Sequence, residues 1–262
     1  MDRTKVISHI VNWLKAYRVQ SGTAGFVVGV SGGIDSAVVS MLVSLTSAPT
    51  LLLEMPIYQP EEQVTRAQEH IRQLIGKFEN TAGKRIDLTS PFDSLVKVLQ
   101  ADEALLNRDL ALANTRSRLR MTTLYYYACL HRYLVVGTGN KVEDFGVGFF
   151  TKYGDGGVDI SPIADLTKSQ VYELAEELGV TESIQKAKPT DGLWGDDRSD
   201  EDQIGASYPE LEWAMSVHET HKSSDFSGRQ KEVFEIYDRL NRLAQHKINP
   251  IPVCKIPKEL LG

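Results

Sequence analysis

The apolar positions along the chain follow two spacings. Val6, Ile10, Val11 and Leu14 recur at helical intervals and predict an amphipathic helix over residues 3–18. The same spacing predicts further helices over residues 60–75, 91–100, 102–112, 114–131, 167–178, 207–221 and 228–246. Short apolar runs predict buried strands over residues 25–28, 50–55 and 133–138, and a weaker strand over 85–88.

Strands that alternate with helices predict an α/β fold. Parallel strands need long crossover connections, which are usually helices, so we expect a mostly parallel sheet covered on both faces. Ligands of such sheets bind beyond the carboxyl ends of the strands. Residues 31–36 and 138–140 both follow predicted strand ends. Two separate features therefore point to one crevice.

Composition narrows the class of protein. The chain has 262 residues and a net charge of −6, so no basic surface suited to nucleic acid is expected. Its two cysteines, Cys129 and Cys254, lack metal-like spacing and are expected to be reduced, buried thiols in the cytosol. No signal peptide or membrane-length apolar run is present in the sequence. We expect one cytoplasmic domain over residues 1–262.

A glycine-rich turn follows the first predicted strand. Glycines permit tight turns, and the first turn of the next helix offers N–H groups and a positive dipole end to an anion. A carboxylate beside a phosphate is repulsive unless a cation lies between them, so we interpret Asp35 as a Mg²⁺ ligand. The predicted phosphate site comprises Gly29, Val30, Ser31, Gly32, Gly33, Ile34, Asp35 and Ser36.

The turn differs from two familiar nucleotide motifs. It has no lysine, so it is not a Walker A loop, and it does not match Gly-x-Gly-x-x-Gly. The alternative is a plain strand–turn–helix connection. Ser-Gly-Gly-Ile-Asp-Ser instead resembles the pyrophosphate loop (PP-loop) of enzymes that split ATP into AMP and pyrophosphate.

A second block, residues 137–168, carries a more specific resemblance. With the PP-loop, its Thr-Lys-Tyr-Gly-Asp-Gly segment at 151–156 resembles the ammonia-dependent NAD synthetase family. Further matches lie at residues 116–121, 193–194, 200–202 and 246–247. The resemblance implies a three-layer α/β/α fold with a Rossmann-like sheet of about five strands, of the adenine nucleotide alpha-hydrolase-like type. It also implies a homodimer, for which the apolar helices over 102–131 could supply the contact or could instead pack internally.

The resemblance implies a ligase reaction. Deamido-NAD is amidated with ammonia, and ATP is the co-substrate and Mg²⁺ the cofactor. An adenylated carboxylate forms first, and the products are NAD, AMP and pyrophosphate. We expect no glutaminase domain. Two rival functions remain: another PP-loop ATP pyrophosphatase, either an amide synthetase or a tRNA-modifying enzyme, and a non-catalytic adenine-nucleotide sensor.

The resemblance also implies roles for individual residues. Thr138, Lys168 and Thr190 would join the loop in binding ATP, and Glu143 would join Asp35 on the metal. The implied deamido-NAD contacts are Arg118, Lys152, Asp159, His246 and Lys247. From the residues alone, the alternatives are a capping hydroxyl for Thr138, a solvated helix-start residue for Glu143, an exposed first-turn lysine for Lys168, and a polar helix end for His246 and Lys247.

Two further expectations concern the same region. The segment between Glu143 and Lys152 is one residue longer than the pattern it resembles, so Asp144 is a fallback metal ligand. Asp155 is a candidate base acting on ammonium. Residues 191–205 are acidic and contain glycine, which is typical either of a mobile active-site lid or of a disordered surface insertion.

Overall fold

The computed structural model describes residues 1–99, 105–190 and 199–261. Within these residues the sheet has four strands, all parallel, in the order β3-β2-β1-β4. The strands are β1 (Gly25–Gly29), β2 (Thr50–Glu54), β3 (Thr81–Arg85) and β4 (Tyr133–Val135). The chain order reverses between β1 and β4, which therefore form the switch point of the sheet, where crevices for ligands occur.

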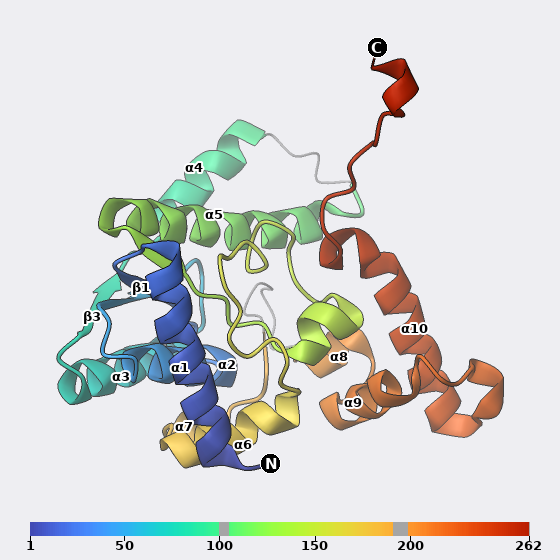
Figure 1. The fold of residues 1–262 in the computed structure, drawn as a ribbon, viewed down its shortest axis with the longest axis horizontal. Coiled ribbons are helices and arrows are strands. Elements are labelled where there is room, and N and C mark those ends of the chain that lie inside the picture. Colours follow the sequence, from blue (N-terminus) through green and yellow to red (C-terminus); the bar gives the residue numbers. More distant parts are fainter. Residues whose placement is uncertain (100–104, 191–198, 262) are drawn as a thin grey trace.

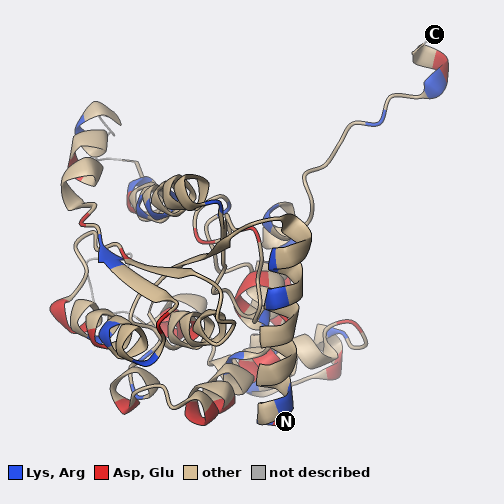
Figure 2. Cartoon of the chain, turned by 60° about the vertical axis from the view of Figure 1, so that its left-hand side comes forward, with Lys and Arg blue, Asp and Glu red and all other residues tan. Residues whose placement is uncertain are grey.

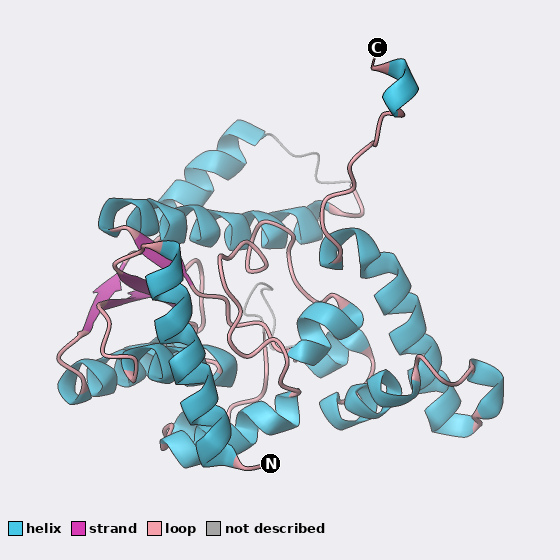
Figure 3. Cartoon of the chain, in the orientation of Figure 1, coloured by secondary structure: helices cyan, strands magenta, loops and turns pink. Residues whose placement is uncertain are grey.

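Helices cover both faces of this sheet (Figures 1 and 3). Successive strand residues point to opposite faces, so Phe26 and Val28 join one apolar core and Val27 joins another. The first core also contains residues of α1 (Arg3–Ser21), α2 (Ile34–Ser44), α3 (Glu61–Lys77) and α6 (Lys168–Leu178). The second contains residues of α4 (Thr89–Leu99) and α5 (Arg108–His131). The predicted three-layer α/β/α architecture is confirmed.

The C-terminal helices form a third apolar cluster beside the sheet. Leu211, Val233 and Tyr237 pack there against Val142. The contributing elements are η1 (Val142–Val147), α9 (Tyr208–Val217) and α10 (Gly228–Ile248), and shorter helices are α7 (Glu182–Gln185), α8 (Asp200–Ile204), η2 (Ser223–Asp225) and η3 (Lys258–Leu260). After α10 the chain runs away from the body as an extended segment (Figures 1 and 2).

Several predicted elements differ from the structure. The weak strand expected over 85–88 lies instead at Thr81–Arg85, an edge strand whose residues are mostly exposed and so leave no apolar signature. The helices expected over 102–112 and 114–131 are represented by the single helix α5, since no helix-breaking residue separates them; residues 100–104 lie outside the described residues. The sheet has four strands rather than about five, although an isolated parallel bridge joins Val136 to Ile160 beyond β4.

The unexpected element is the π-helix η1. A π-helical turn takes up more residues than an α-helical one and is often found at functional sites. It overlaps the segment between Glu143 and Lys152, where the resemblance predicts one extra residue. Its C-cap, Gly148, has a φ of 63°, a left-handed conformation that suits glycine. That η1 takes up the expected extra residue stays a prediction.

The exposure of the two cysteines corrects one expectation from the sequence. Cys129 and Cys254 are both exposed, so the prediction of buried thiols is wrong; on α5, Cys129 lies beside Ala128, which faces the core instead. Acidic and basic residues are interspersed over the helices in Figure 2. Among the described helices, none combines the length and the apolar character that crossing a bilayer requires.

Candidate active site

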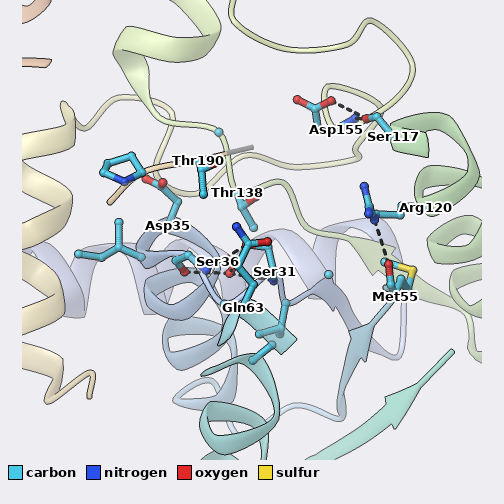
Figure 4. A pocket seen from close by; sticks show the side chains of 18 of the residues that line it. Ser31, Asp35, Ser36, Met55, Gln63, Ser117, Arg120, Thr138, Asp155 and Thr190 are labelled. Atoms are coloured by element: carbon cyan, nitrogen blue, oxygen red, sulfur yellow. Dashed lines mark hydrogen bonds between the residues drawn. The ribbon is translucent and has the colours of Figure 1, made fainter. Parts of the chain in front are cut away.

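The candidate site is a cavity of about 280 Å³ at the carboxyl ends of β1, β2 and β4 (Figure 4). The N–H of Val30 donates to Leu53 O at 2.8 Å, and that of Val136 donates to Val27 O at 3.0 Å. These bonds hold the three chain segments together just before they separate at the cavity. The predicted crevice at the switch point is therefore present in the structure.

The PP-loop lines this cavity over its whole length, residues 29–36. Gly32 has a φ of 84°, and a Cβ there would lie 2.5 Å from Gln63 O, so both its conformation and its surroundings favour glycine. The hydroxyls of Ser31 and Ser36 lie 3.1 Å apart, and Ser31 Oγ accepts the N–H of Gly33 at 3.2 Å. The loop is held in shape by its own side chains, with the N-terminus of α2 at its end.

Two acidic side chains predicted to converge do so. The Lys168 ammonium donates to Asp35 Oδ2 at 2.5 Å and to Glu143 Oε1 at 3.0 Å. Burial opposes the charge on Lys168, but the two carboxylates outweigh it and raise the pKa of the lysine above its ordinary value. Burial raises the pKa of Asp35 also, against the effect of the adjacent ammonium. A cation is thus held between two carboxylates at the end of the PP-loop.

This arrangement fits a magnesium site. Mg²⁺ prefers oxygen ligands and commonly uses one or two carboxylates, completed by phosphates and water. The lysine ammonium already lies where both carboxylates favour positive charge. Among the described residues, no group of three His, Cys, Asp or Glu side chains is arranged to hold a metal ion.

Two buried residues for which the sequence predicted no role hold the carboxylates in place: Asn140, which lies in the segment 138–140 expected at the crevice, and Tyr208. Asn140 donates its amide to Asp35 Oδ1 at 3.2 Å, and its carbonyl oxygen accepts the N–H of Glu143 at 3.2 Å. The Tyr208 hydroxyl donates to Glu143 Oε1 at 2.5 Å. Asn140 could have been recognised as a capping residue before η1; Tyr208 gave no signal beyond membership of an amphipathic helix.

Asp144 is placed differently from Glu143. Its carboxyl packs against Gly139, where a Cβ would lie only 2.0 Å from Asp144 Oδ2. Both acids line the cavity, but only Glu143 bonds to the ammonium it shares with Asp35. Burial, followed by the surrounding carboxylates, raises the pKa of Asp144 well above its ordinary value. The geometry favours Glu143 over Asp144 as the partner of Asp35.

Asp155 lies at another part of the cavity wall, beside Ser117 (Figure 4). The Ser117 hydroxyl donates to Asp155 Oδ1 at 2.6 Å, and the N–H of Thr151 donates to the same oxygen at 3.1 Å. Loss of water around the carboxyl raises the pKa of Asp155, and the Ser117 hydrogen bond opposes that rise. Ser117 lies within the matching segment 116–121, but the sequence assigned it no role.

The other predicted ATP contacts divide into two groups. Thr138 and Thr190 both line the cavity and lie on the same side of Ser31 and Ser36 in Figure 4. Lys168 is not among the residues that line it; its side chain is buried and its ammonium lies between Asp35 and Glu143. The alternative of an exposed first-turn lysine is therefore wrong, while contact with phosphate stays a prediction.

None of the five predicted deamido-NAD contacts lines the cavity. Arg118 donates to Lys152 O at 3.3 Å, and Lys152 in turn donates to His246 O. Lys247 donates to the carbonyl oxygens of Gly148 and Phe150. These four residues are brought together where the loop after η1 meets the end of α10.

Asp159 has a separate place. It accepts the Tyr125 hydroxyl at 2.9 Å and the N–H of Val135 at 2.8 Å, which ties α5 to β4. Its role in substrate binding stays a prediction.

The predicted lid lies partly outside the described residues, which omit 191–198. On either side of that gap, Thr190 and Asp200 both line the cavity, and the N–H of Asp200 donates to Pro189 O at 3.1 Å. Residues 200–204 form α8. The ends of the segment are thus close together at the cavity, and the lid stays a prediction.

A parallel α/β sheet with this loop and a paired carboxylate site defines an ATP-using enzyme that binds nucleotide at its switch point. A family model described as NAD synthase matches residues 6–250. The NH(3)-dependent NAD(+) synthetase of Carboxydothermus hydrogenoformans is 37% identical over 239 residues, which cover 91% of this chain and 92% of that relative. The chain belongs to the NAD synthase family.

Solved structures agree with this assignment. The NMN synthetase of Francisella tularensis has a TM-score of 0.84 at 30% identity, covering 98% of this chain and 99% of that one. The NH3-dependent NAD synthetase of Campylobacter jejuni, solved in complex with the nitrate ion, has a TM-score of 0.78 at 26% identity, covering 97% and 100%. The family forms carbon–nitrogen bonds, so this protein is a ligase.

Proposed function

We propose that the protein amidates deamido-NAD with ammonia at the expense of ATP, giving NAD, AMP and pyrophosphate. The observation that carries this function is the meeting of the PP-loop with Asp35 and Glu143 at the switch point of the sheet, in a chain of the NAD synthase family. The PP-loop supplies N–H groups and hydroxyls to the phosphates, and Thr138 and Thr190 border the nucleotide. Mg²⁺ held by Asp35 and Glu143 would neutralise charge on the triphosphate.

The reaction has two steps. The nicotinate carboxylate attacks the α-phosphorus of ATP, which forms an acyl-adenylate and releases pyrophosphate. Ammonia then attacks the acyl carbon, and AMP leaves with the bonding electrons. Because the nucleophile is neutral ammonia, ammonium must lose a proton, and Asp155 is the carboxylate in the cavity placed by Ser117 to accept it. Arg118, Lys152, Asp159, His246 and Lys247 would bind the dinucleotide.

A second substrate is favoured by one observation. A structural neighbour at 30% identity is an NMN synthetase, so nicotinate mononucleotide is the alternative acceptor. It has the same carboxylate and lacks the adenylyl half of deamido-NAD. Either substrate would react in the same cavity. Only deamido-NAD would also need the proposed dinucleotide contacts, which lie outside the cavity lining.

One assay tests these assignments. Purified protein receives Mg-ATP, ammonium and either deamido-NAD or nicotinate mononucleotide, and pyrophosphate and the amide product are both measured. We expect equal amounts of the two products, with a higher kcat/KM for deamido-NAD. Pyrophosphate release only with another acceptor would indicate a different PP-loop enzyme. Tight ATP binding without turnover would indicate a nucleotide sensor.

Two finer properties belong to the same proposal. We assign a homodimer, because Leu105, Leu106, Leu110, Tyr126 and Leu130 on and before α5 are exposed apolar side chains. Sedimentation of the Leu106→Asp variant should then show a smaller species.

We also assign the protein to the cytoplasm, where its exposed cysteines would stay reduced. The mixed surface charge supports small molecules, rather than nucleic acid, as its substrates.

A further inference from the structure

Lys168 is the residue whose position departs most from its expected role. A lysine that contacts the phosphates of ATP should face the cavity, yet Lys168 is not among the lining residues. Its ammonium is directed instead to Asp35 and Glu143. The ammonium therefore occupies the position between the carboxylates where a divalent cation would bind.

The surroundings of Lys168 keep it there. The Tyr208 ring lies 4.7 Å from the ammonium, and the Tyr208 hydroxyl bonds to the same Glu143 oxygen as the lysine does. Without a cation, two partly buried carboxylates so close together would repel each other and carry uncompensated charge. One lysine ammonium satisfies both acids and gains a contact with the aromatic face.

We propose that Lys168 is the resident counter-ion of the Asp35–Glu143 pair, and that it leaves the pair for the triphosphate when magnesium and ATP bind. This inference rests on the proposed function. The lysine stem is flexible and ends in a compact charge, which suits such an exchange. Asp35 and Glu143 would hold the divalent ion in place of the ammonium, and Lys168 would pair with the phosphates, so that no charged group would be left without a partner.

The exchange makes metal binding depend on nucleotide. In the nucleotide-free protein a divalent ion must displace an ammonium whose ion pairs, within the described part of the chain, are with Asp35 and Glu143. Metal alone should therefore bind weakly, although two carboxylates are already in place. Removal of the lysine charge should let Asp35 and Glu143 bind the metal without nucleotide, so that metal affinity no longer depends on ATP.

The test measures Mn²⁺ binding to nucleotide-free protein by electron paramagnetic resonance. Lys168→Met should bind Mn²⁺ at least about tenfold more tightly than the wild type, because a positive charge next to both ligands has been removed. The matched control is Lys141→Met, which removes a charge from the exposed pair formed by Lys141 and Asp165 at 2.8 Å. Its Mn²⁺ affinity should equal that of the wild type.

Equal Mn²⁺ affinity in the wild type and Lys168→Met would overturn the inference. A measurement on the wild type guards against a variant that fails to fold. The ¹⁵Nζ resonance of Lys168, assigned by its loss in Lys168→Arg, should shift with Mg²⁺ and a non-hydrolysable ATP analogue but not with Mg²⁺ alone. A full shift with Mg²⁺ alone contradicts the exchange. Failure of the proposed function is separate, since it is detected as absence of NAD formation whatever the metal affinities.

Discussion

The two ends of the candidate site are built in different ways. At the nucleotide end, the PP-loop and the Asp35–Glu143 pair follow directly from strand and helix termini, and their side chains bond to one another. At the dinucleotide end, Arg118, Lys152 and Lys247 come from helix surfaces and a long loop and bond mainly to backbone carbonyl oxygens. At the first end the side chains bond to one another, whereas at the second the proposed dinucleotide contacts bond to carbonyl oxygens that a substrate would have to replace.

This difference predicts that the two ends affect different kinetic constants. Groups fixed before substrate arrives can stabilise developing charge without reorganisation, which is the larger contribution to rate. A side chain that gives up a hydrogen bond to a carbonyl oxygen in order to bond a substrate oxygen gains only the difference in free energy between the two bonds. This gain is smaller, and it affects substrate affinity and therefore KM. Substitutions at the nucleotide end should therefore lower kcat, and those at the dinucleotide end should raise KM.

Asp35→Asn should have the largest effect. The variant removes one ligand of the proposed metal and one partner of Lys168, so we expect kcat to fall about 10²–10³-fold. Pyrophosphate release at saturating substrates measures this loss. Asp165→Asn, at an acid whose side chain is 96% exposed, is the control and should retain activity. Wild-type kcat in Asp35→Asn would show that the fixed end does not carry the chemistry.

Glu143→Gln and Asp144→Asn compare neighbours within η1. Glu143 shares the ammonium with Asp35, so its replacement should lower kcat about 100-fold, while replacement of Asp144 should cost less than about tenfold. The Mg²⁺ concentration for half-maximal rate should rise only in Glu143→Gln. The reverse order would make Asp144 the metal ligand and would place the register of the π-helical turn one residue later.

Arg118→Ala addresses the dinucleotide end. Loss of a charged hydrogen-bond donor should raise the KM for deamido-NAD about tenfold and leave the KM for ATP unchanged. Initial rates with each substrate varied in turn separate the two constants. Arg242→Ala, at an exposed arginine of α10, controls for the loss of positive charge. A lower kcat with an unaltered KM would contradict the prediction that the two ends affect different kinetic constants.

The smallest expected effect is on the pH dependence of folding stability, through a buried histidine between α3 and α2. His70 is fully buried on α3 and lies 2.8 Å from Ser40 Oγ on α2, and burial lowers its pKa from 6.5 to about 4. Since the unfolded chain takes up the proton more readily, stability is complete above pH 6.5 and is lost as the pH falls toward 4.

From pH 7 to pH 5, His70 should therefore cost about 2 kcal/mol of unfolding free energy. Urea unfolding at the two pH values measures this change. The His70→Gln variant, which keeps a polar group near Ser40, should lose that part of the pH dependence. An unchanged slope in the variant would mean that other groups control the acid sensitivity.

The sequence predicted the nucleotide end better than the rest. The glycines of the PP-loop, the apolar strands before it and the helix after it are local signals, and strand ends in a parallel sheet must meet, so Asp35 and Glu143 could be placed together. Tyr208 could not be found this way, because its hydroxyl reaches Glu143 only through the packing of α9 on η1. Strand β3 was misplaced since an edge strand with exposed residues has no apolar pattern.

The π-helical turn at Val142–Val147 has a consequence for comparing this chain with its relatives. A residue added inside one wide turn leaves the segments before and after it in their spatial positions. If the extra residue expected between Glu143 and Lys152 lies in this turn, alignments should open their gap there, so that both residues stay paired with their structural equivalents. A gap placed after Gly148 would shift the intervening residues by one and transfer the wrong acid from one sequence to the next.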